Sequence, residues 1–347
     1  MHTPLDSTRT SRLTIALTLA AGFAAATGGL AQQTSFARLP GDVLDVAPPS
    51  TRVSGAPGRM TIGETSCRSV SMADLRRRIV DVAVQEWGFF GFTVVDQTIV
   101  VPDDDGRPRP RRRWPRLSTE VSGRVAGSIA GYWTATPEGG WILDAQNEAW
   151  TGPSGIAARW RYPWSAAFVS WVMCEGGLGD EAQFKRAVAH HVYIDQAIRA
   201  GTVDGRPAFT AYDVGMEPIA PGDLICSARR PAYRSIAERR GQMGTGARTH
   251  CDIVVKLDEP RNRILAIGGN VRASVSLKLL PAVREPGGHL QPVPGARRMF
   301  AHLKLRADPI DANALDRSPT MRALVCGEGR VAPSWRAAAS LVADDVC

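Results

Sequence analysis

The chain has 347 residues, of which 44% are hydrophobic and 22% charged, and its formal net charge is +8. This composition excludes disorder over the whole length and allows one large domain or two modest ones. The charge would attract nucleic acid, cell-wall polymers or anionic lipid, but no zinc-finger spacing, recognition-helix pattern or RNA-binding aromatic motif accompanies it, so we expect no nucleic-acid partner.

The first segment in chain order is a candidate export signal. Two arginines precede an uncharged apolar run over residues 13–26, and residues 29–31 (GLA) place small side chains where a signal peptidase reads. We expect residues 1–31 to be a signal peptide cleaved before Gln32. Their removal takes away two Arg and one Asp and leaves a charge near +7. The mature protein is then periplasmic or secreted, and only an uncleaved form would associate with a membrane.

The next segments predict a lead-in followed by helices. Residues 32–66 are rich in Pro, Gly, Ser and Thr and indicate a linker or an irregular lead-in. Apolar residues at helical spacing predict helices over 73–87, with Ser71 as N-cap, and over 117–132. Further helices are predicted over 165–175 and 180–200.

Two segments between these helices lack a clear period. Residues 107–116 (RPRPRRRWPR) are typical of a solvated loop, with contact to an anionic surface as the alternative. Residues 133–153 are rich in Trp and Gly. Their tryptophans either pack in the core or line a groove for sugar or peptide, and we favour packing.

Short apolar runs separated by turn residues then predict an antiparallel meander. The predicted strands of the meander cover residues 222–228, 251–257, 263–267 and 274–280, and a last apolar run spans 298–305. A separate strand is predicted over 92–101, before the second helix. Helices followed by such strands predict an α+β fold without alternating βαβ units. We expect one domain over 67–308, with a Pro/Arg- and Trp-rich insertion at about 102–160, and a C-terminal tail over 309–347.

Six cysteines allow three disulfides in an oxidising compartment, with fifteen possible pairings. We favour Cys326 with Cys347, which closes the tail, and Cys226 with Cys251 on neighbouring strands, which leaves Cys67 with Cys174. The alternative is that some are buried free thiols. Since no CxxC or other usual zinc spacing occurs, we expect no metal and no cofactor.

Three residues are candidates for chemistry. Ser165 begins a predicted helix, whose N-terminus can activate a nucleophile or stabilise an oxyanion, although a serine there is often only an N-cap. His250 begins an apolar strand, on the same face as Asp252, and suits a general base. The amide of Asn270 is suited to orienting such a histidine.

These residues lie in four motifs in a fixed order, namely Pro163-Trp164-Ser165-Ala166-Ala167-Phe168, Pro221-Gly222-Asp223, His250, and Gly268-Gly269-Asn270. The order of these motifs resembles that in the CHAP-type and NlpC-type cell-wall amidases and endopeptidases. The resemblance covers roughly residues 72–281. The chain also resembles the family of domain of unknown function 2272. Ser165 stands where the amidases carry their nucleophilic cysteine.

The resemblance implies a papain-like α+β fold, with N-terminal helices packed on a small antiparallel sheet. It implies an amidase- or peptidase-like hydrolase acting on peptidoglycan or its peptide fragments. Ser165 would be the nucleophile, His250 the base and Asn270 the group that orients it. We expect three residues to border the substrate, namely Trp164, His190 and Asp252.

Serine in place of cysteine opens two alternatives. A serine hydroxyl must lose its proton to a base during attack, whereas a thiol ionises near neutral pH. The first alternative is therefore a catalytically inactive module that binds peptidoglycan or a partner protein, with Ser165 capping its helix. The second is an ester-directed acyl hydrolase or acyltransferase.

Overall fold

The structure is a computed structural model in which six ranges are described: residues 36–98, 117–201, 207–293, 299–327, 331–343 and 346–347. The predicted signal peptide and the Pro/Arg run at 107–116 lie outside these ranges. Within them, no helix combines the length and the apolar character that crossing a membrane requires.

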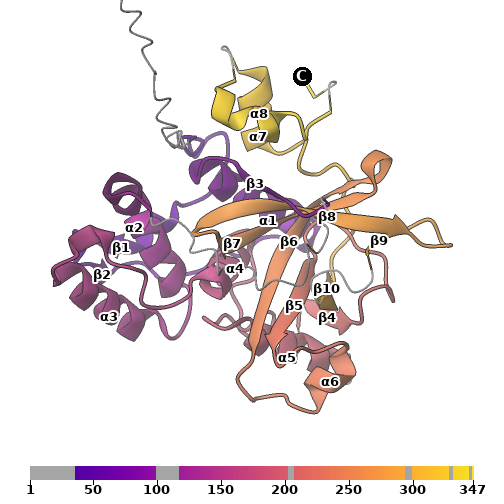
Figure 1. The fold of residues 1–347 in the computed structure, drawn as a ribbon, viewed down its shortest axis with the longest axis horizontal. Coiled ribbons are helices and arrows are strands. Elements are labelled where there is room, and N and C mark those ends of the chain that lie inside the picture. Colours follow the sequence, from indigo (N-terminus) through magenta and orange to yellow (C-terminus); the bar gives the residue numbers. More distant parts are fainter. Residues whose placement is uncertain (1–35, 99–116, 202–206, 294–298, 328–330, 344–345) are drawn as a thin grey trace, which may run out of the picture. The chain divides into compact units, whose positions relative to one another are not determined.

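A mixed sheet organises the fold (Figure 1). Its strand order is β3-β8-β7-β6-β5-β10-β4, with β9 paired to β8. The strands are β3 (Thr93–Asp96), β4 (Phe209–Tyr212), β5 (Leu224–Arg230), β6 (Arg248–Asp258), β7 (Arg263–Val271), β8 (Ser274–Arg284), β9 (Leu290–Pro292) and β10 (Met299–Leu305). Only β3 runs parallel to its neighbour. The predicted meander is confirmed, since β5, β6, β7 and β8 pair antiparallel in succession.

The helices of the described ranges complete an α+β architecture, as predicted. They are α1 (Met72–Phe89), α2 (Thr119–Thr134), α3 (Gly139–Thr151), α4 (Ser165–Gly176), α5 (His190–Ala200), α6 (Ile236–Arg240), α7 (Pro319–Cys326) and α8 (Arg336–Ala339). A separate ribbon of β1 (Val53–Ser54) and β2 (Thr61–Ile62) lies beside α2 and α3 (Figure 1). The helices predicted over 73–87, 117–132 and 165–175 correspond to α1, α2 and α4.

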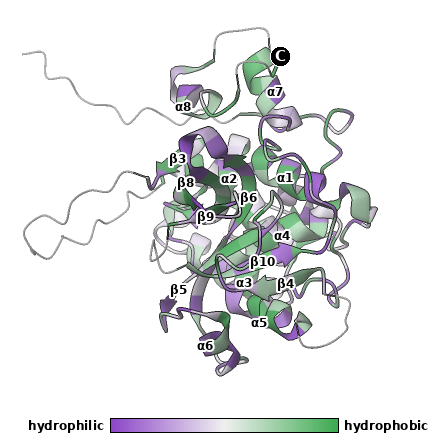
Figure 2. Ribbon diagram, turned by 90° about the vertical axis from the view of Figure 1, so that its right-hand side faces the viewer, coloured by the Kyte–Doolittle hydropathy of each residue, from purple (hydrophilic) through white to green (hydrophobic). Residues whose placement is uncertain are grey.

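Helix α4 lies at the centre of the core. Every residue from Ala166 to Gly176 is buried, and the helix contacts α1, α2, β6 and β7. A helix that is apolar on all sides must be enclosed in this way. Figure 2 shows the apolar ribbon concentrated where α1 and α4 meet the sheet. This packing fixes the position of Ser165 at the N-terminus of α4.

The helix predicted over 180–200 is shorter than expected, because only its second half is helical. Hydrogen bonds to other elements hold the preceding segment as a turn followed by irregular backbone. The Ser170 hydroxyl accepts from the amide of Ala187 and donates to its carbonyl, both at 3.0 Å. The Gln196 side chain accepts from the Lys185 amide at 2.7 Å. Helix α5 therefore begins at His190.

The lead-in and the C-terminal tail belong to the same compact unit as the sheet. This unit runs from residue 33 to the C-terminus. Leu44 of the lead-in and Leu315 and Met321 of the tail are buried in the main core. The buried ammonium of Lys256 in β6 binds both carboxylate oxygens of Asp316, at 2.8 and 2.7 Å. Neither segment is thus a free appendage.

All six cysteines are paired, and the pairing favoured from the sequence is confirmed. The disulfides are Cys67–Cys174, Cys226–Cys251 and Cys326–Cys347. They join the segment just before α1 to α4, cross-link β5 to β6, and close the tail on α7. Three disulfides are compatible with an extracellular or periplasmic location.

Candidate active site

Ser165 is the first residue of α4, and its side chain points to another helix. The N-cap position belongs to Trp164, and no side chain caps α4. The Ser165 hydroxyl Oγ lies 2.8 Å from Nε2 of His190. A purely capping role for Ser165 is therefore excluded, because its hydroxyl is engaged with the imidazole.

His190 is the first residue of α5 and is only 4% exposed. Helix α5 packs on β4 and β6, which holds the ring between Ser165 and the sheet. At its other nitrogen, Nδ1, the ring meets two groups: the backbone amide of Cys251 at 3.2 Å and the hydroxyl of Tyr193, one turn later in α5. His190 is thus held from three sides.

The amide of Cys251 is free to reach His190 because of its place in the sheet. Cys226 and Cys251 face each other with a Cα–Cα distance of 4.0 Å, as in a non-hydrogen-bonded pair, whose N–H groups point toward the opposite neighbour. On that side, the pairing of β6 with β7 ends at Ile253 and Ile267. The imidazole takes the place of the missing β7 carbonyl.

A backbone amide can only donate, so its bond to Nδ1 favours the neutral tautomer whose proton is on Nε2. In that tautomer Nε2 donates to Ser165. Burial, followed by the neighbouring His250, holds the pKa of His190 well below its usual range. The ring is therefore neutral at pH 7, which is the protonation state that a general base requires.

His250 lies beside this pair but is bonded elsewhere. The centroids of the His190 and His250 rings are 4.9 Å apart. Nε2 of His250 is 2.9 Å from Asp252 Oδ1, and Lys278 Nζ is 2.7 Å from Asp252 Oδ2. The serine that we expected to pair with His250 is thus hydrogen-bonded to His190, while His250 is backed by a carboxylate.

Charge pairing sets the protonation states of Asp252 and His250. Burial opposes ionisation of Asp252, but Lys278 and His250 outweigh it and keep its pKa below the usual range. Burial and then Lys278 lower the pKa of His250. Asp252 is therefore a carboxylate that accepts from Nε2 of His250, which leaves the Nδ1 lone pair of a neutral His250 for another partner.

The Gly-Gly-Asn motif has a backbone explanation. A Cβ on Gly268 would lie 2.0 Å from Asp252 Oδ1, and a Cβ on Gly269 would lie 2.6 Å from Phe168 Cβ. Asn270 has a φ of 55° at a bulge between β7 and β8, in the left-handed region that asparagine tolerates. Among the described contacts, no hydrogen bond joins the Asn270 amide to His250, and Nε2 of His250 is bonded to Asp252 instead.

The three residues expected to border the substrate differ in their surroundings. Trp164 is fully buried and stacks on Phe90 and Tyr132, so it belongs to the core. His190 contacts Ser165 directly, and Asp252 is bonded to His250. All three residues are buried, and it is their contacts that separate the two polar residues from the tryptophan.

Two residues that contact this site were not assigned a role from the sequence: Tyr193, bonded to His190, and Lys278, bonded to Asp252. Lys278 had a detectable signal, because it interrupts the apolar strand over 274–280 and a lysine there needs a buried partner. Tyr193 shares a helix face with His190 at a spacing of three. That spacing alone is equally typical of core packing.

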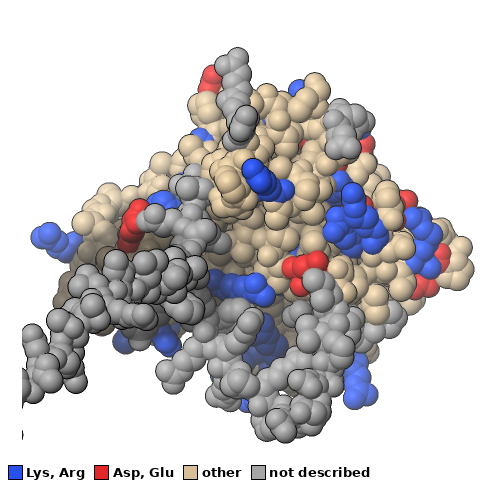
Figure 3. All heavy atoms as spheres, turned by 45° about the horizontal axis from the view of Figure 1, so that its top comes forward, with Lys and Arg blue, Asp and Glu red and all other residues tan. Residues whose placement is uncertain are grey.

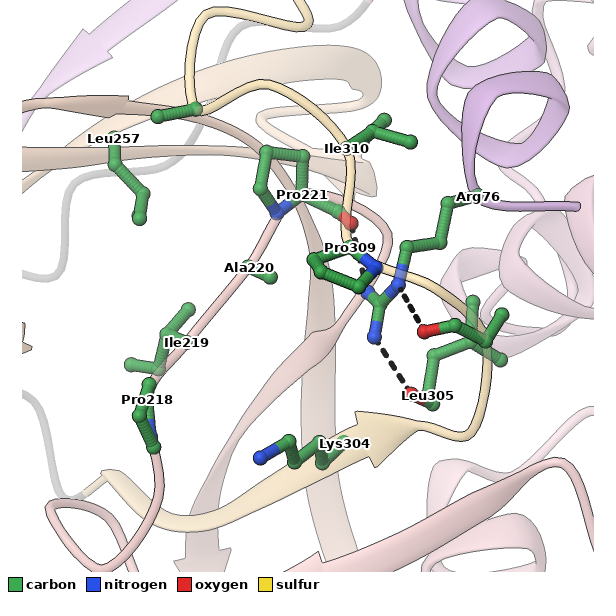
Figure 4. A pocket seen from close by; sticks show the side chains of 12 residues that line it. Arg76, Pro218, Ile219, Ala220, Pro221, Leu257, Lys304, Leu305, Pro309 and Ile310 are labelled. Carbon is green, nitrogen blue, oxygen red and sulfur yellow. Dashed lines mark hydrogen bonds between the residues drawn. The ribbon is translucent and has the colours of Figure 1, made fainter. Parts of the chain in front are cut away.

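A separate cavity of about 410 Å³ lies away from these residues (Figure 4). Its lining is mostly apolar, with Pro218, Pro221 and Pro309 among its walls. The Arg76 guanidinium at its edge binds the carbonyls of Pro221, Leu305 and Ala307 and the carboxylate of Asp223. The Pro-Gly-Asp motif therefore ties α1 to β5 and β10 and has a structural role.

The described residues include no group of three His, Cys, Asp or Glu side chains that could hold a metal ion. On the face in Figure 3, Lys and Arg side chains are dispersed over the visible described surface and form no continuous track.

Fold and site together define an α+β protein in which a partly buried serine at a helix N-terminus is hydrogen-bonded to a buried histidine. Residues 114–295, more than half of the chain, match the model of the family described as "Uncharacterized protein conserved in bacteria (DUF2272)". The chain belongs to this family. No curated protein and no solved structure matches it significantly. Ser165, His190, His250, Asp252 and Lys278 all lie within the matched region.

Proposed function

We propose that this chain is an exported amidase- or peptidase-like hydrolase in which Ser165 is the nucleophile and His190 the general base. The observation that supports this role is the 2.8 Å contact between Ser165 Oγ and His190 Nε2. It is the geometry of an activated nucleophile. A buried helix that begins with the nucleophile and packs on an antiparallel meander also supports a papain-like arrangement.

The reaction follows from this geometry. Ser165 Oγ attacks the acyl carbon while Nε2 of His190 takes the hydroxyl proton, and the carbonyl electron pair moves onto its oxygen. When the C–N or C–O bond breaks, Nε2 returns the proton to the leaving amine or alcohol. Water then repeats the sequence and releases the acid and free Ser165.

The start of α4 supplies groups for the developing oxyanion. Since no side chain caps the helix, the N–H groups of its first turn keep their capacity to stabilise negative charge. The Phe168 amide already binds the Trp164 carbonyl at 2.9 Å. This leaves the amides of Ser165, Ala166 and Ala167 as the candidate donors.

An aromatic pair near Ser165, made of the exposed Trp141 and the partly buried Tyr162, supports a large substrate such as peptidoglycan. Trp141 is 51% exposed, and its ring meets Tyr162 edge to face with centroids 4.8 Å apart. Tyr162 precedes Ser165 by three residues, which places the two Cα atoms within about 11 Å. Aromatic side chains at a surface offer large contact area for a glycan or peptide.

The second candidate is a non-catalytic module that binds the same wall material. The Cys251 amide favours it, because the tautomer that this bond stabilises makes Ser165 an acceptor instead of a proton donor. The exposed Trp141 serves binding equally well without catalysis. The two candidates differ in turnover, not in the surface they present.

Purified peptidoglycan separates the two. We expect wild type to release soluble fragments with new amino termini, and Ser165→Ala to bind the polymer in a pelleting assay without releasing any. Binding that persists in Ser165→Ala and falls in Trp141→Ala, with no release by folded wild type, would establish the binding module. Absence of both binding and release would contradict the choice of substrate.

A further inference from the structure

We propose that Tyr193 is a positioning residue that allows His190 to carry its proton on Nδ1, the tautomer in which Nε2 can accept the proton of Ser165. The inference rests on the proposed function of Ser165. It assigns a role to a buried hydroxyl that the reaction steps above do not use.

Two groups are bonded to Nδ1 of His190, and they favour different tautomers of the ring. The Cys251 amide is a donor in every state, so it opposes a proton on Nδ1. The Tyr193 hydroxyl can donate to a bare Nδ1 or accept from a protonated one. Of the two groups bonded to Nδ1, only Tyr193 can therefore stabilise the Nδ1–H tautomer.

The surroundings of Tyr193 keep its hydroxyl in this role. The side chain is 1% exposed and its ring packs against Phe184, with centroids 4.9 Å apart. Burial and then the charge of Asp252 raise the pKa of Tyr193 well above its usual range. The phenol stays neutral, so it offers an oxygen lone pair to His190 without placing a second negative charge in the core.

Proton transfer makes the requirement explicit. If Nε2 already holds a proton, its lone pair is absent and Ser165 has no base within reach. With the proton on Nδ1 and held by Tyr193, Nε2 takes the hydroxyl proton and the ring becomes an imidazolium. The same Nδ1–H···O bond then strengthens, because its donor is charged.

The variant Tyr193→Phe removes the hydroxyl and keeps the ring packing. The matched control is Tyr233→Phe, which removes another buried hydroxyl, bonded to Arg239 and Gln242. Long-range ¹H–¹⁵N correlation spectra of ¹⁵N-histidine protein report which nitrogen is protonated, with His190→Gln used to assign the signals among the six histidines. Labelling rates with a fluorophosphonate report the reactivity of Ser165.

We expect Tyr193→Phe to show protonation at Nε2 of His190 alone, and wild type and Tyr233→Phe to show in addition a population protonated at Nδ1. Labelling should fall about 10²-fold in Tyr193→Phe, the lower range for general-base catalysis. Identical His190 spectra in wild type and Tyr193→Phe would overturn the inference, as would unchanged labelling. Unlabelled wild type would instead overturn the proposed function, while the spectra would still decide which tautomer Tyr193 supports.

Discussion

Gly268 is the position where one added carbon should disrupt the charge network of the site. Its Cβ would lie 2.0 Å from Asp252 Oδ1 and 3.1 Å from His250 Nε2. Real contacts of this kind are rarely below 3 Å, so in Gly268→Ala the carboxylate must move by about 1 Å or more. That displacement breaks the 2.9 Å bond to His250 and the 2.7 Å bond to Lys278.

The loss of stability in Gly268→Ala follows from the charges that stay buried without a partner. Breaking a buried charge pair leaves an uncompensated ion and typically costs 3–5 kcal/mol. We therefore expect Gly268→Ala to lower the free energy of unfolding by about 3 kcal/mol, measured by urea denaturation with the disulfides intact. Labelling of Ser165 should weaken as well, since His250 packs beside His190.

A matched glycine gives the control. Gly123 is exposed in the interior of α2, and a Cβ there meets nothing within 4 Å. Gly123→Ala should raise the free energy of unfolding by about 0.5–1 kcal/mol through helix propensity. If Gly268→Ala proves as stable as wild type, the steric reasoning about Asp252 is refuted.

Two further predictions concern buried charges outside the site. Burial raises the pKa of Asp81 from 3.8 to about 7, so the stability it confers is complete below pH 3.8 and is lost as the pH rises through 7. Asp81→Asn should remove this loss, about 3 kcal/mol between pH 4.5 and 8, as read by urea unfolding at the two pH values. Lys256→Met leaves Asp316 buried without its cation and should cost about 3–5 kcal/mol and expose the tail to limited proteolysis. The double variant Lys256→Met, Asp316→Leu should recover most of that loss, and a double variant as unstable as the single one would contradict this account.

Elements with a local signal were predictable from the sequence. Apolar spacing gave α1, α2 and α4, and turn residues between short apolar runs gave the meander β5 to β8. Helix α3 was missed because it begins at two glycines, Gly139 and Gly140, and no side chain caps it. The first half of the predicted 180–200 helix is a turn followed by irregular backbone, because the side chains of Ser170 in α4 and Gln196 in α5 bind its backbone groups.

The site was predictable in part for the same reason. Ser165 has a local signal, since a small polar residue begins an apolar helix. Its hydrogen-bond partner depends on how α5 packs on β6, which no local pattern contains, so His190 was expected to border the substrate and not to contact Ser165. Asn270 was expected to orient His250, but the structure shows Asp252 bonded to that histidine. The left-handed backbone of the bulge accounts for an asparagine at position 270.

The assignment of Ser165 and His190 can be tested by mapping a fluorophosphonate adduct on the purified protein by mass spectrometry. We predict one adduct, on Ser165, that is lost in Ser165→Ala and His190→Ala and retained in Ser227→Ala, a hydroxyl of β5 that contacts the His250 carbonyl. Folded wild type that forms no adduct, even with the smallest reactive fluorophosphonate, would contradict the claim that Ser165 is an activated nucleophile.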